Sequence, residues 1–330
     1  MPTVYQPGQA VDHYIIINVL GQGDASHVYL ACDQHTQQEV VLKFPHIDEI
    51  GSADVFARYQ REREIGQYLS HPRIQRHLNQ TEQRSGDYLV LEYLHGQTLR
   101  ATMKQCAPDL LPAEEVIRLL LQIVDTLAFV HEQGVIHRDI KPENILQREN
   151  GDIVVCDFGI AQWARASKRR LGGIGIASPI GTPDYMAPEL LWGKPGSVQT
   201  DCYAVGVMLY ELLCGHTPFM EQDGFEFVTE HISHDPPGIL TTQPTLSPAL
   251  ATVVMRAIRR DPRKRYASMR ELWHDLAHLE DVTPTDYLPD PPLIGGRYRQ
   301  VLRLALIVLV FCVVIVAFGL LAQFAHPAGR

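Results

Sequence analysis

The sequence lacks the patterns that would assign it to several common classes of protein. Its six cysteines include no C-x-x-C pair, so no cysteine-based zinc site or dense disulfide framework is readable and a reducing compartment fits best. The net charge of −9 argues against a general nucleic-acid binder, which needs a basic face. Residues 1–10 are polar and hold no secretory signal. With 45% hydrophobic and 20% charged residues, the chain has the composition of a folded protein.

One long apolar run is present near the C-terminal end. Residues 304–322 hold nineteen residues without a charge, enough for a helix about 29 Å long, which matches a hydrocarbon core of about 30 Å. The flanking arginines are Arg297, Arg299 and Arg303 before the run and Arg330 after it. The excess of arginine on the N-terminal side of the run predicts a single-pass protein of the cell membrane whose large N-terminal part is cytoplasmic. Residues 323–330 form the predicted extracytoplasmic tail, which is too short for a sensor domain.

The rest of the chain divides into an extension (1–13), one large domain (14–280) and a proline-rich linker (281–303). The linker is predicted to be an extended juxtamembrane tether. It isolates residues 304–322 from the domain, which argues against the alternative of a buried core helix.

Within residues 14–280, the first part favours strands and the second favours helices. The β-like runs are 14–20, 27–32, 40–44 and 88–93, with a helical stretch at 53–69 between them. Residues 114–133 carry apolar side chains at a helical period. Further helices are expected at 201–214, 248–259 and 269–279.

A glycine-rich turn lies between the first two predicted strands. Gly21, Gln22 and Gly23 open it, and glycines allow backbone N–H groups to approach a phosphate closely. A dinucleotide-binding fold would need a third glycine leading into a helix, but Ser26 and a strand follow here, which disfavours it. Lys43 then ends the apolar run 40–42, and a buried lysine is costly unless a carboxylate pairs with it. An edge-strand lysine is the alternative.

Three further segments carry the most specific signal. They are His-Arg-Asp-Ile-Lys-Pro-Glu-Asn at 137–144, Asp-Phe-Gly at 157–159 and Gly-Thr-Pro-Asp-Tyr-Met-Ala-Pro-Glu at 181–189. Their assembly by chance in this order and at these spacings is negligible. On these motifs, residues 14–280 resemble a protein kinase of the serine/threonine class, similar to the membrane-bound eukaryotic-like (Hanks-type) kinases of bacteria.

The resemblance covers about four-fifths of the chain and implies the bilobal α+β kinase fold. The small β-rich lobe would span about 14–94 and the large helical lobe about 95–280. ATP and Mg²⁺, or Mn²⁺ in its place, would bind between the lobes. Val28, Val41 and Leu146 would then hold the adenine ring, with Leu91 as gatekeeper, and Glu92 and Leu94 would offer backbone groups to its edge.

The same resemblance assigns the reacting groups. Lys43 would contact the α- and β-phosphates beneath Gly21, Gln22 and Gly23, while Asn144 and Asp157 would hold the metal. Asp139 would accept the substrate hydroxyl proton, Lys141 would neutralise the transferred phosphoryl group, and Thr182 would tie the peptide-docking loop to them. Two supporting contacts are also expected: Asp201 capping the catalytic-loop backbone, and a buried pair between Glu189 and Arg265.

The partner of Lys43 is ambiguous between Glu62 and Glu64. The family's usual spacing to His71 favours Glu62. The residue one turn further on is then Gly66, which costs roughly 1 kcal/mol relative to alanine in a helix and offers no side chain for packing behind the metal-binding loop. We therefore expect a loosely held helix that needs help to reach the active position.

Regulation is expected through phosphorylation of the segment before Gly181. Ser178 lies four residues before Thr182, where this family often carries its activating phosphosite, and Ser167 is the second choice. Phosphoserine would bring a charge of about −1.5 to −2 to Arg138.

The leading hypothesis is a membrane-tethered kinase that transfers the γ-phosphoryl group of ATP to serine or threonine hydroxyls of proteins, including its own. A catalytically silent pseudokinase scaffold is the alternative; its usual mark, loss of Lys43, Asp139 or Asp157, is absent. Protein substrates and the membrane are the expected partners, and nucleic acid is not. A homodimer would suit autophosphorylation in trans, although no residue pattern supports one directly.

Overall fold

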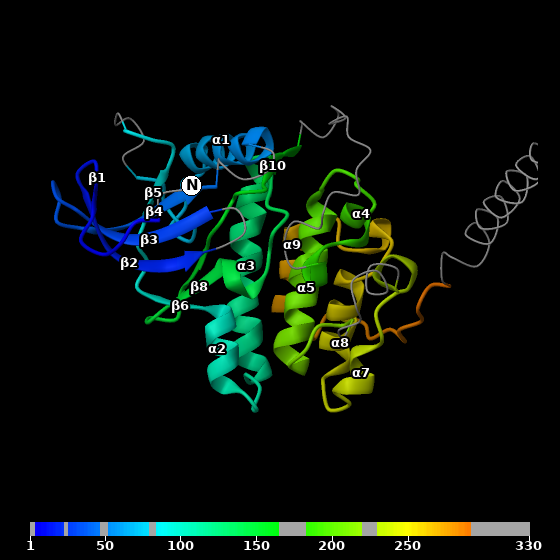
Figure 1. Cartoon of the computed structure of the whole chain (residues 1–330). Helices are drawn as coiled ribbons and strands as arrows, with labels where there is room; N and C mark the ends of the chain where they lie inside the picture. The colour runs from blue at the N-terminus through cyan, green and yellow to red at the C-terminus, as the bar shows by residue number, and fades with distance from the viewer. Residues whose placement is uncertain are drawn as a thin grey trace, which may run out of the picture.

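The computed structural model describes residues 4–22, 26–46, 52–78, 84–164, 183–219 and 230–291, which form two lobes (Figure 1). The blue to cyan strands and one blue helix make up the small lobe, and the teal to orange helices make up the large lobe. The predicted bilobal architecture is therefore confirmed. Within those ranges, no helix is both long and apolar enough to cross a bilayer. The apolar run 304–322 lies outside them.

The small lobe is built on a five-stranded antiparallel sheet in which the strands follow their order in the sequence. The strands are β1 (Ala10–Val11), β2 (Tyr14–Gln22), β3 (Ser26–Asp33), β4 (Glu39–Pro45) and β5 (Leu89–Glu92). The helix α1 (Ser52–Tyr68) packs against β4. The predicted strands and helix of this half are confirmed.

Alternation along β4 decides which side chains face α1. Successive side chains of a strand point to opposite faces, so Val40 and Leu42 share one face while Val41 and Lys43 share the other. Val40 and Leu42 join a buried cluster on the face away from α1. Val41 packs instead with Tyr59 of α1. Lys43 is thereby directed toward α1.

The large lobe is helical and packs around α5. Its helices are α2 (Leu99–Cys106), α3 (Ala113–Glu132), α4 (Pro188–Leu191), α5 (Val198–Cys214), α7 (Ile239–Thr242), α8 (Pro248–Ala257) and α9 (Met269–Ala277). α5 is buried along nearly its whole length, and α3 and α8 pack against it. The apolar positions predicted for α3 are all fully buried: Val116, Leu119, Leu120, Ile123, Leu127 and Val130.

Two small sheets lie where the lobes meet. One contains β6 (Gly96–Thr98), β8 (Ile145–Arg148) and β9 (Ile153–Val155), and the other pairs β7 (Val135–Ile136) with β10 (Gln162–Trp163). The segment 137–144 runs from β7 to β8, and the segment 156–161 runs from β9 to β10. Because β8 pairs with β9, the ends of these two segments are held side by side. The N–H of Cys156 donates to the carbonyl of Asn144 at 2.9 Å.

The first residues of the predicted linker are in contact with the domain. Residues 281–291 have no regular secondary structure beyond a turn at 281, but they dock on the large lobe. The Tyr287 hydroxyl donates to the carbonyl of Pro236 at 2.7 Å, and the guanidinium of Arg259 lies 4.6 Å from the centre of the Tyr287 ring. Lys264 pairs with Asp290 at 2.5 Å. The expectation of a tether from residue 281 is thus corrected: the chain stays fixed to the lobe as far as Pro291.

Candidate active site

Lys43, Glu62 and Asp157 meet between the two lobes. The Nζ atom of Lys43 donates to Oε1 of Glu62 at 2.7 Å and to Oδ1 of Asp157 at 2.8 Å. Glu62 lies on the buried face of α1 with Ile65, whereas Glu64 is exposed. The ambiguity between the two glutamates is therefore resolved in favour of Glu62.

This cluster keeps the lysine and Asp157 charged. Burial alone would lower the pKa of Lys43, but the charges of Asp157 and Glu62 outweigh it and raise the pKa. Burial would likewise raise the pKa of Asp157, yet the ammonium of Lys43 holds it at about 2. Burial raises the pKa of Glu62, against the opposing effect of Lys43. The Asp157 side chain remains 41% exposed, so an ionised carboxylate faces the space between the lobes.

A second cluster lies on the segment between β7 and β8. Lys141 donates through Nζ to both carboxylate oxygens of Asp139, at 3.2 and 3.0 Å. Asn144 donates through Nδ2 to the Asp139 carbonyl at 2.8 Å and to its Oδ2 at 2.9 Å. The Asp139 carboxylate is therefore fixed from two sides while remaining partly exposed.

Asp201 of α5 holds the backbone at the start of the segment 137–144. Its carboxylate accepts the N–H of His137 at 2.9 Å and that of Arg138 at 2.8 Å, and it lies 2.7 Å from Nε2 of His131. Burial would raise the pKa of Asp201, but the hydrogen bond and charge of His131 outweigh it and lower the pKa. The predicted capping role is confirmed. The cap supports Arg138 at a φ of +70°, a conformation that side-chain-bearing residues rarely adopt.

The predicted brace of the large lobe is also present. Arg265 donates to both carboxylate oxygens of Glu189, at 2.8 and 2.9 Å. The Arg265 side chain is fully buried, and a paired, doubly hydrogen-bonded geometry is what a buried ion pair requires.

The space beside Gly66 is filled by a residue that the sequence analysis missed. A Cβ atom placed on Gly66 would lie 2.1 Å from Nε2 of His77, so the imidazole packs directly against the helix backbone. Position 77 forms an isolated bridge with Leu91 of β5, which ties the ring to the sheet. Burial, followed by the charges of Lys43 and Arg84, lowers the pKa of His77 to about 4. A neutral ring thus packs against α1 at Gly66, where the sequence analysis expected no side chain to support the helix.

The residues expected around adenine line the junction of the lobes. Val28 packs with Val41 and Leu91, which pair across β4 and β5. Leu94 is buried, and Leu146 lies half-buried in β8. The sequence analysis did not anticipate that Gln75 donates through Nε2 to the Glu92 carbonyl at 2.9 Å, so one lone pair of that oxygen is already engaged.

Several predicted residues fall partly or wholly outside the described part of the chain. Gly21 and Gln22 close β2, where Gly21 pairs with Val28, but Gly23 lies beyond the described end of that strand. Thr182, Ser167 and Ser178 also lie outside the described residues.

Arg138 lies in surroundings that suit an anion. Burial, then the charge of Arg61, lowers the pKa of its guanidinium against the opposing charge of Asp201, and Arg58 adds a smaller lowering effect. Nη1 donates to Oε1 of Gln162 at 3.1 Å, whereas Nε is buried and meets no hydrogen-bond partner among the described residues. Clustered guanidinium groups of this kind are favourable for a phosphate.

Comparison with known proteins assigns the family. The protein kinase domain model matches residues 14–276, which is most of the chain. The chain belongs to the protein kinase family. The kinase domain is 33% identical over 267 residues to "Probable serine/threonine-protein kinase PknB" of Lactococcus lactis, covering 81% of this chain and 42% of that protein. It is 31% identical over 269 residues to "Serine/threonine-protein kinase PrkC" of Bacillus subtilis, covering 82% and 41%. The chain thus spans about two-fifths of the length of these relatives.

Solved structures agree on the fold. The kinase domain of PknI from Mycobacterium tuberculosis superposes with a TM-score of 0.65 at 23% identity, covering 84% of this chain and all of that one. At that identity the likeness concerns the fold alone.

Protein kinases as a family use ATP and a divalent metal, and the residues of this kinase domain fit both. Asp157 offers an ionised, partly exposed carboxylate, and Asn144 offers an amide oxygen because its Nδ2 is turned toward Asp139. Oxygen ligands of this kind suit Mg²⁺ or Mn²⁺. The ammonium of Lys43 is charged and aimed at the same space, as a phosphate contact requires.

Proposed function

We propose that this protein is a serine/threonine kinase that transfers the γ-phosphoryl group of ATP to protein hydroxyls. The observation that carries the proposal is the pairing of Lys43 with Glu62 while Asp157 lies within 2.8 Å of the same ammonium. These contacts join both lobes around one space. The names of the bacterial relatives favour serine and threonine as acceptors.

In this proposal the nucleotide is held from three sides. Lys43, fixed by Glu62, binds the α- and β-phosphates, and Gly21 and Gln22 begin the turn that covers them. Asp157 and Asn144 hold the metal, which supplies positive charge to the phosphate oxygens. Because Lys43 is anchored by a buried carboxylate, the phosphates are oriented without further rearrangement of the side chain.

Asp139 is proposed to act on the acceptor. Its carboxylate, held by Lys141 and Asn144, orients the incoming hydroxyl and accepts its proton. Lys141 lies 3.0 Å from Asp139 and would place its charge beside the transferred group. The two residues thus perform complementary tasks on one short segment.

Autophosphorylation of Ser178, with Ser167 as the second candidate, is proposed to stabilise the active form. The support is Arg138, whose Nε atom is buried without a hydrogen-bond partner among the described residues and whose surroundings include the charge of Arg61. A phosphate near Arg138 would supply the missing acceptor and offset the clustered positive charge.

Phosphosite mapping tests this function. The full chain in detergent, incubated with Mg-ATP, is expected to acquire phosphate on Ser178, and Asp157→Asn treated identically is expected to acquire none. Ser178→Ala should reach a lower final activity after preincubation with ATP, whereas Ser167→Ala should match the wild type. No phosphate on the wild-type chain would favour the scaffold alternative. Full activation of Ser178→Ala would remove the proposed role of that serine.

We further propose that residues 304–322 anchor the kinase in the cell membrane with residues 1–291 on the cytoplasmic side. The support is the nineteen-residue uncharged run and the arginines before it. Docking of residues 281–291 would fix the point at which the chain leaves the large lobe.

The full chain is expected to remain in the membrane pellet after alkaline carbonate extraction, while a chain lacking 304–322 becomes soluble. Extraction of the full chain by carbonate would contradict the anchor.

A further inference from the structure

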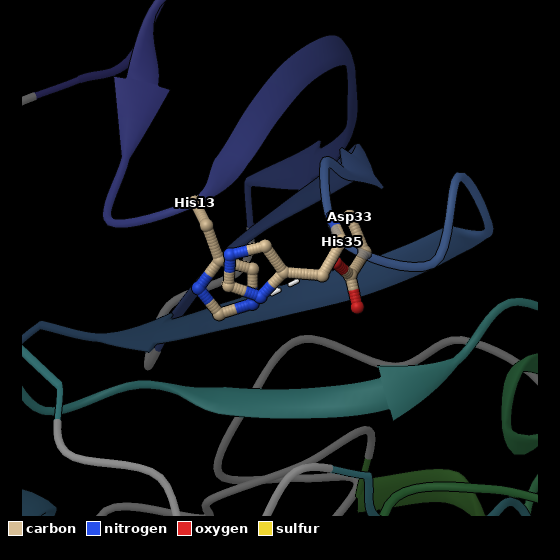
Figure 2. Close-up of side chains that lie close together, drawn as sticks. All are labelled: His13, Asp33 and His35. Carbon is tan, nitrogen blue, oxygen red and sulfur yellow. Dashed lines mark hydrogen bonds and ion pairs between the residues drawn. The ribbon is translucent and has the colours of Figure 1, made fainter.

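Three metal-ligating side chains lie together at the end of the small-lobe sheet that is remote from the glycine-rich turn. His13 lies in the turn before β2, Asp33 ends β3, and His35 follows it in the turn before β4 (Figure 2). The pairing of β2 with β3 runs from Tyr14–Asp33 at this end to Gln22–His27 at the other. Along β3 these ends are six residues apart, which at about 3.3 Å per residue is about 20 Å, so the cluster is distinct from the proposed nucleotide site.

The backbone around the cluster is held firmly. The N–H of Gln34 donates to the His13 carbonyl at 2.9 Å, which joins the two turns. Asp33 and Gln38 close the second turn, with the Asp33 N–H donating to the Gln38 carbonyl at 2.9 Å. Because the fold already fixes these two turns, binding of a ligand there would cost little backbone conformational entropy.

The side chains present two imidazoles and one carboxylate to a common space. One ligand atom from each residue lies within 4.8 Å of the other two. Nε2 of His13 is 3.7 Å from Oδ1 of Asp33. The His13 and His35 rings lie together in Figure 2. They stack with their centres 4.1 Å apart and their planes 10° from parallel.

Asp33 is an unusual residue for the end of a strand because its side chain is almost fully buried. The carboxylate accepts the N–H of His35 at 2.8 Å and that of Thr36 at 3.3 Å, which fixes it beside the two rings. His35, in contrast, is exposed and leaves a path from solvent.

We propose that His13, Asp33 and His35 bind one divalent transition-metal ion, with zinc as the best match. Two imidazole nitrogens and one carboxylate oxygen form a borderline donor set that suits Zn²⁺ and disfavours Mg²⁺. In a tetrahedral zinc site with bonds of about 2.0–2.1 Å, neighbouring ligand atoms lie about 3.4 Å apart. The ligand atoms now lie within 4.8 Å of one another, so the side chains would have to close slightly on the ion, and a water would complete the shell.

Binding of the ion is expected to cross-link the two turns. The ion would join the start of β2 to the connection between β3 and β4, without touching the residues proposed for catalysis. Zinc is therefore expected to raise the melting temperature of the protein, because a ligand that binds only the folded chain stabilises it.

Zinc titration of the full chain, stripped of metal with a chelator, tests the proposal. Calorimetry should show one tight site in the wild type. His35→Ala, which removes an exposed ligand without disturbing the core, should weaken that site by at least about tenfold, since even partners outside the metal shell change affinity by about 10–100-fold. Zinc should raise the melting temperature of the wild type but not of His35→Ala.

The matched control is His278→Ala. His274 and His278 lie one turn apart with ring centres separated by 4.8 Å and form a competing pair. His278→Ala should keep the tight site. Its loss in His278→Ala, or its retention in His35→Ala, would overturn the proposal. Bound Co²⁺ should show no thiolate charge-transfer band; such a band would assign the metal to a cysteine and also overturn it.

Discussion

Replacing Asp139 by asparagine is expected to lower kcat by about 100-fold to 10,000-fold, which is the usual contribution of a general base. The KM for ATP should change much less than kcat, because Lys43 and Asp157 do not touch the Asp139 side chain, and Asn144, which donates to it, can still donate to the amide oxygen of an asparagine. Asparagine has nearly the same shape as aspartate and can still accept a hydrogen bond from Lys141, so the local structure should persist. Steady-state assays with Mg-ATP and a generic basic protein measure both parameters.

Glu143→Gln is the matched control for this prediction. Glu143 is a neighbouring carboxylate on the same segment, but its side chain pairs with Arg100 at 2.6 Å rather than with Lys141 or Asn144. The Glu143→Gln protein should keep a kcat within a few-fold of that of the wild type. An Asp139→Asn protein with unimpaired kcat would show that Asp139 is not the base.

Replacing Gly66 by leucine is expected to lower kcat about tenfold to 100-fold. A Cβ at this position would overlap the His77 ring, so either the ring or α1 must move. Overpacking of this kind costs about 1–3 kcal/mol, and displacement of α1 would draw Glu62 away from Lys43. Gly86→Ala is the control, since nothing lies within 4 Å of its added Cβ.

The compensating variant makes this prediction specific. In Gly66→Leu/His77→Ala, the leucine side chain can occupy the space that the imidazole has vacated. We expect the double variant to recover most of the activity that either single change removes, which is the non-additivity of residues in direct contact. Additive losses would show that the ring does not position α1 through Gly66.

The pH dependence of stability gives a second measurement on the same contact. The pKa of His77 is about 4 in the folded chain, against about 6.5 for an unperturbed histidine. As the pH falls, His77 therefore takes up a proton in the unfolded chain before it does so in the folded chain. The stability gained by burying the neutral ring is fully present above about pH 6.5 and is lost as the pH falls toward 4. Urea unfolding at pH 7 and pH 5 should show a smaller loss of stability for the Gly66→Leu/His77→Ala variant than for the wild type.

Much of this site follows from patterns within single elements. Alternation along β4 places Lys43 on the face of Val41, and this can be read from the sequence once the strand is recognised. The choice of Glu62 could also have been made from helical period alone, because Tyr59 and Ile65 share its buried face while Glu64 is exposed.

The parts that the sequence did not predict depend on contacts between distant segments. His77 lies in an irregular stretch whose residues have no period, so nothing in it indicates that the ring meets Gly66, eleven positions earlier. Residues 281–291 are proline-rich and lack regular secondary structure beyond one turn, but their docking depends on Arg259 and Lys264 across the lobe surface. Extended conformation and detachment are separate properties, and composition indicates only the first.

The central claim is that Lys43, Glu62 and Asp157 hold a nucleotide for phosphoryl transfer. Its most direct test is the transfer of radiolabelled γ-phosphate from ATP to a generic basic protein by the full-length wild type and by Asp157→Asn. We predict metal-dependent incorporation on serine and threonine in the wild type, and none above background in the variant, with both proteins equally folded by circular dichroism. Equal incorporation by the two proteins, or none by the wild type with metal present, would contradict the claim.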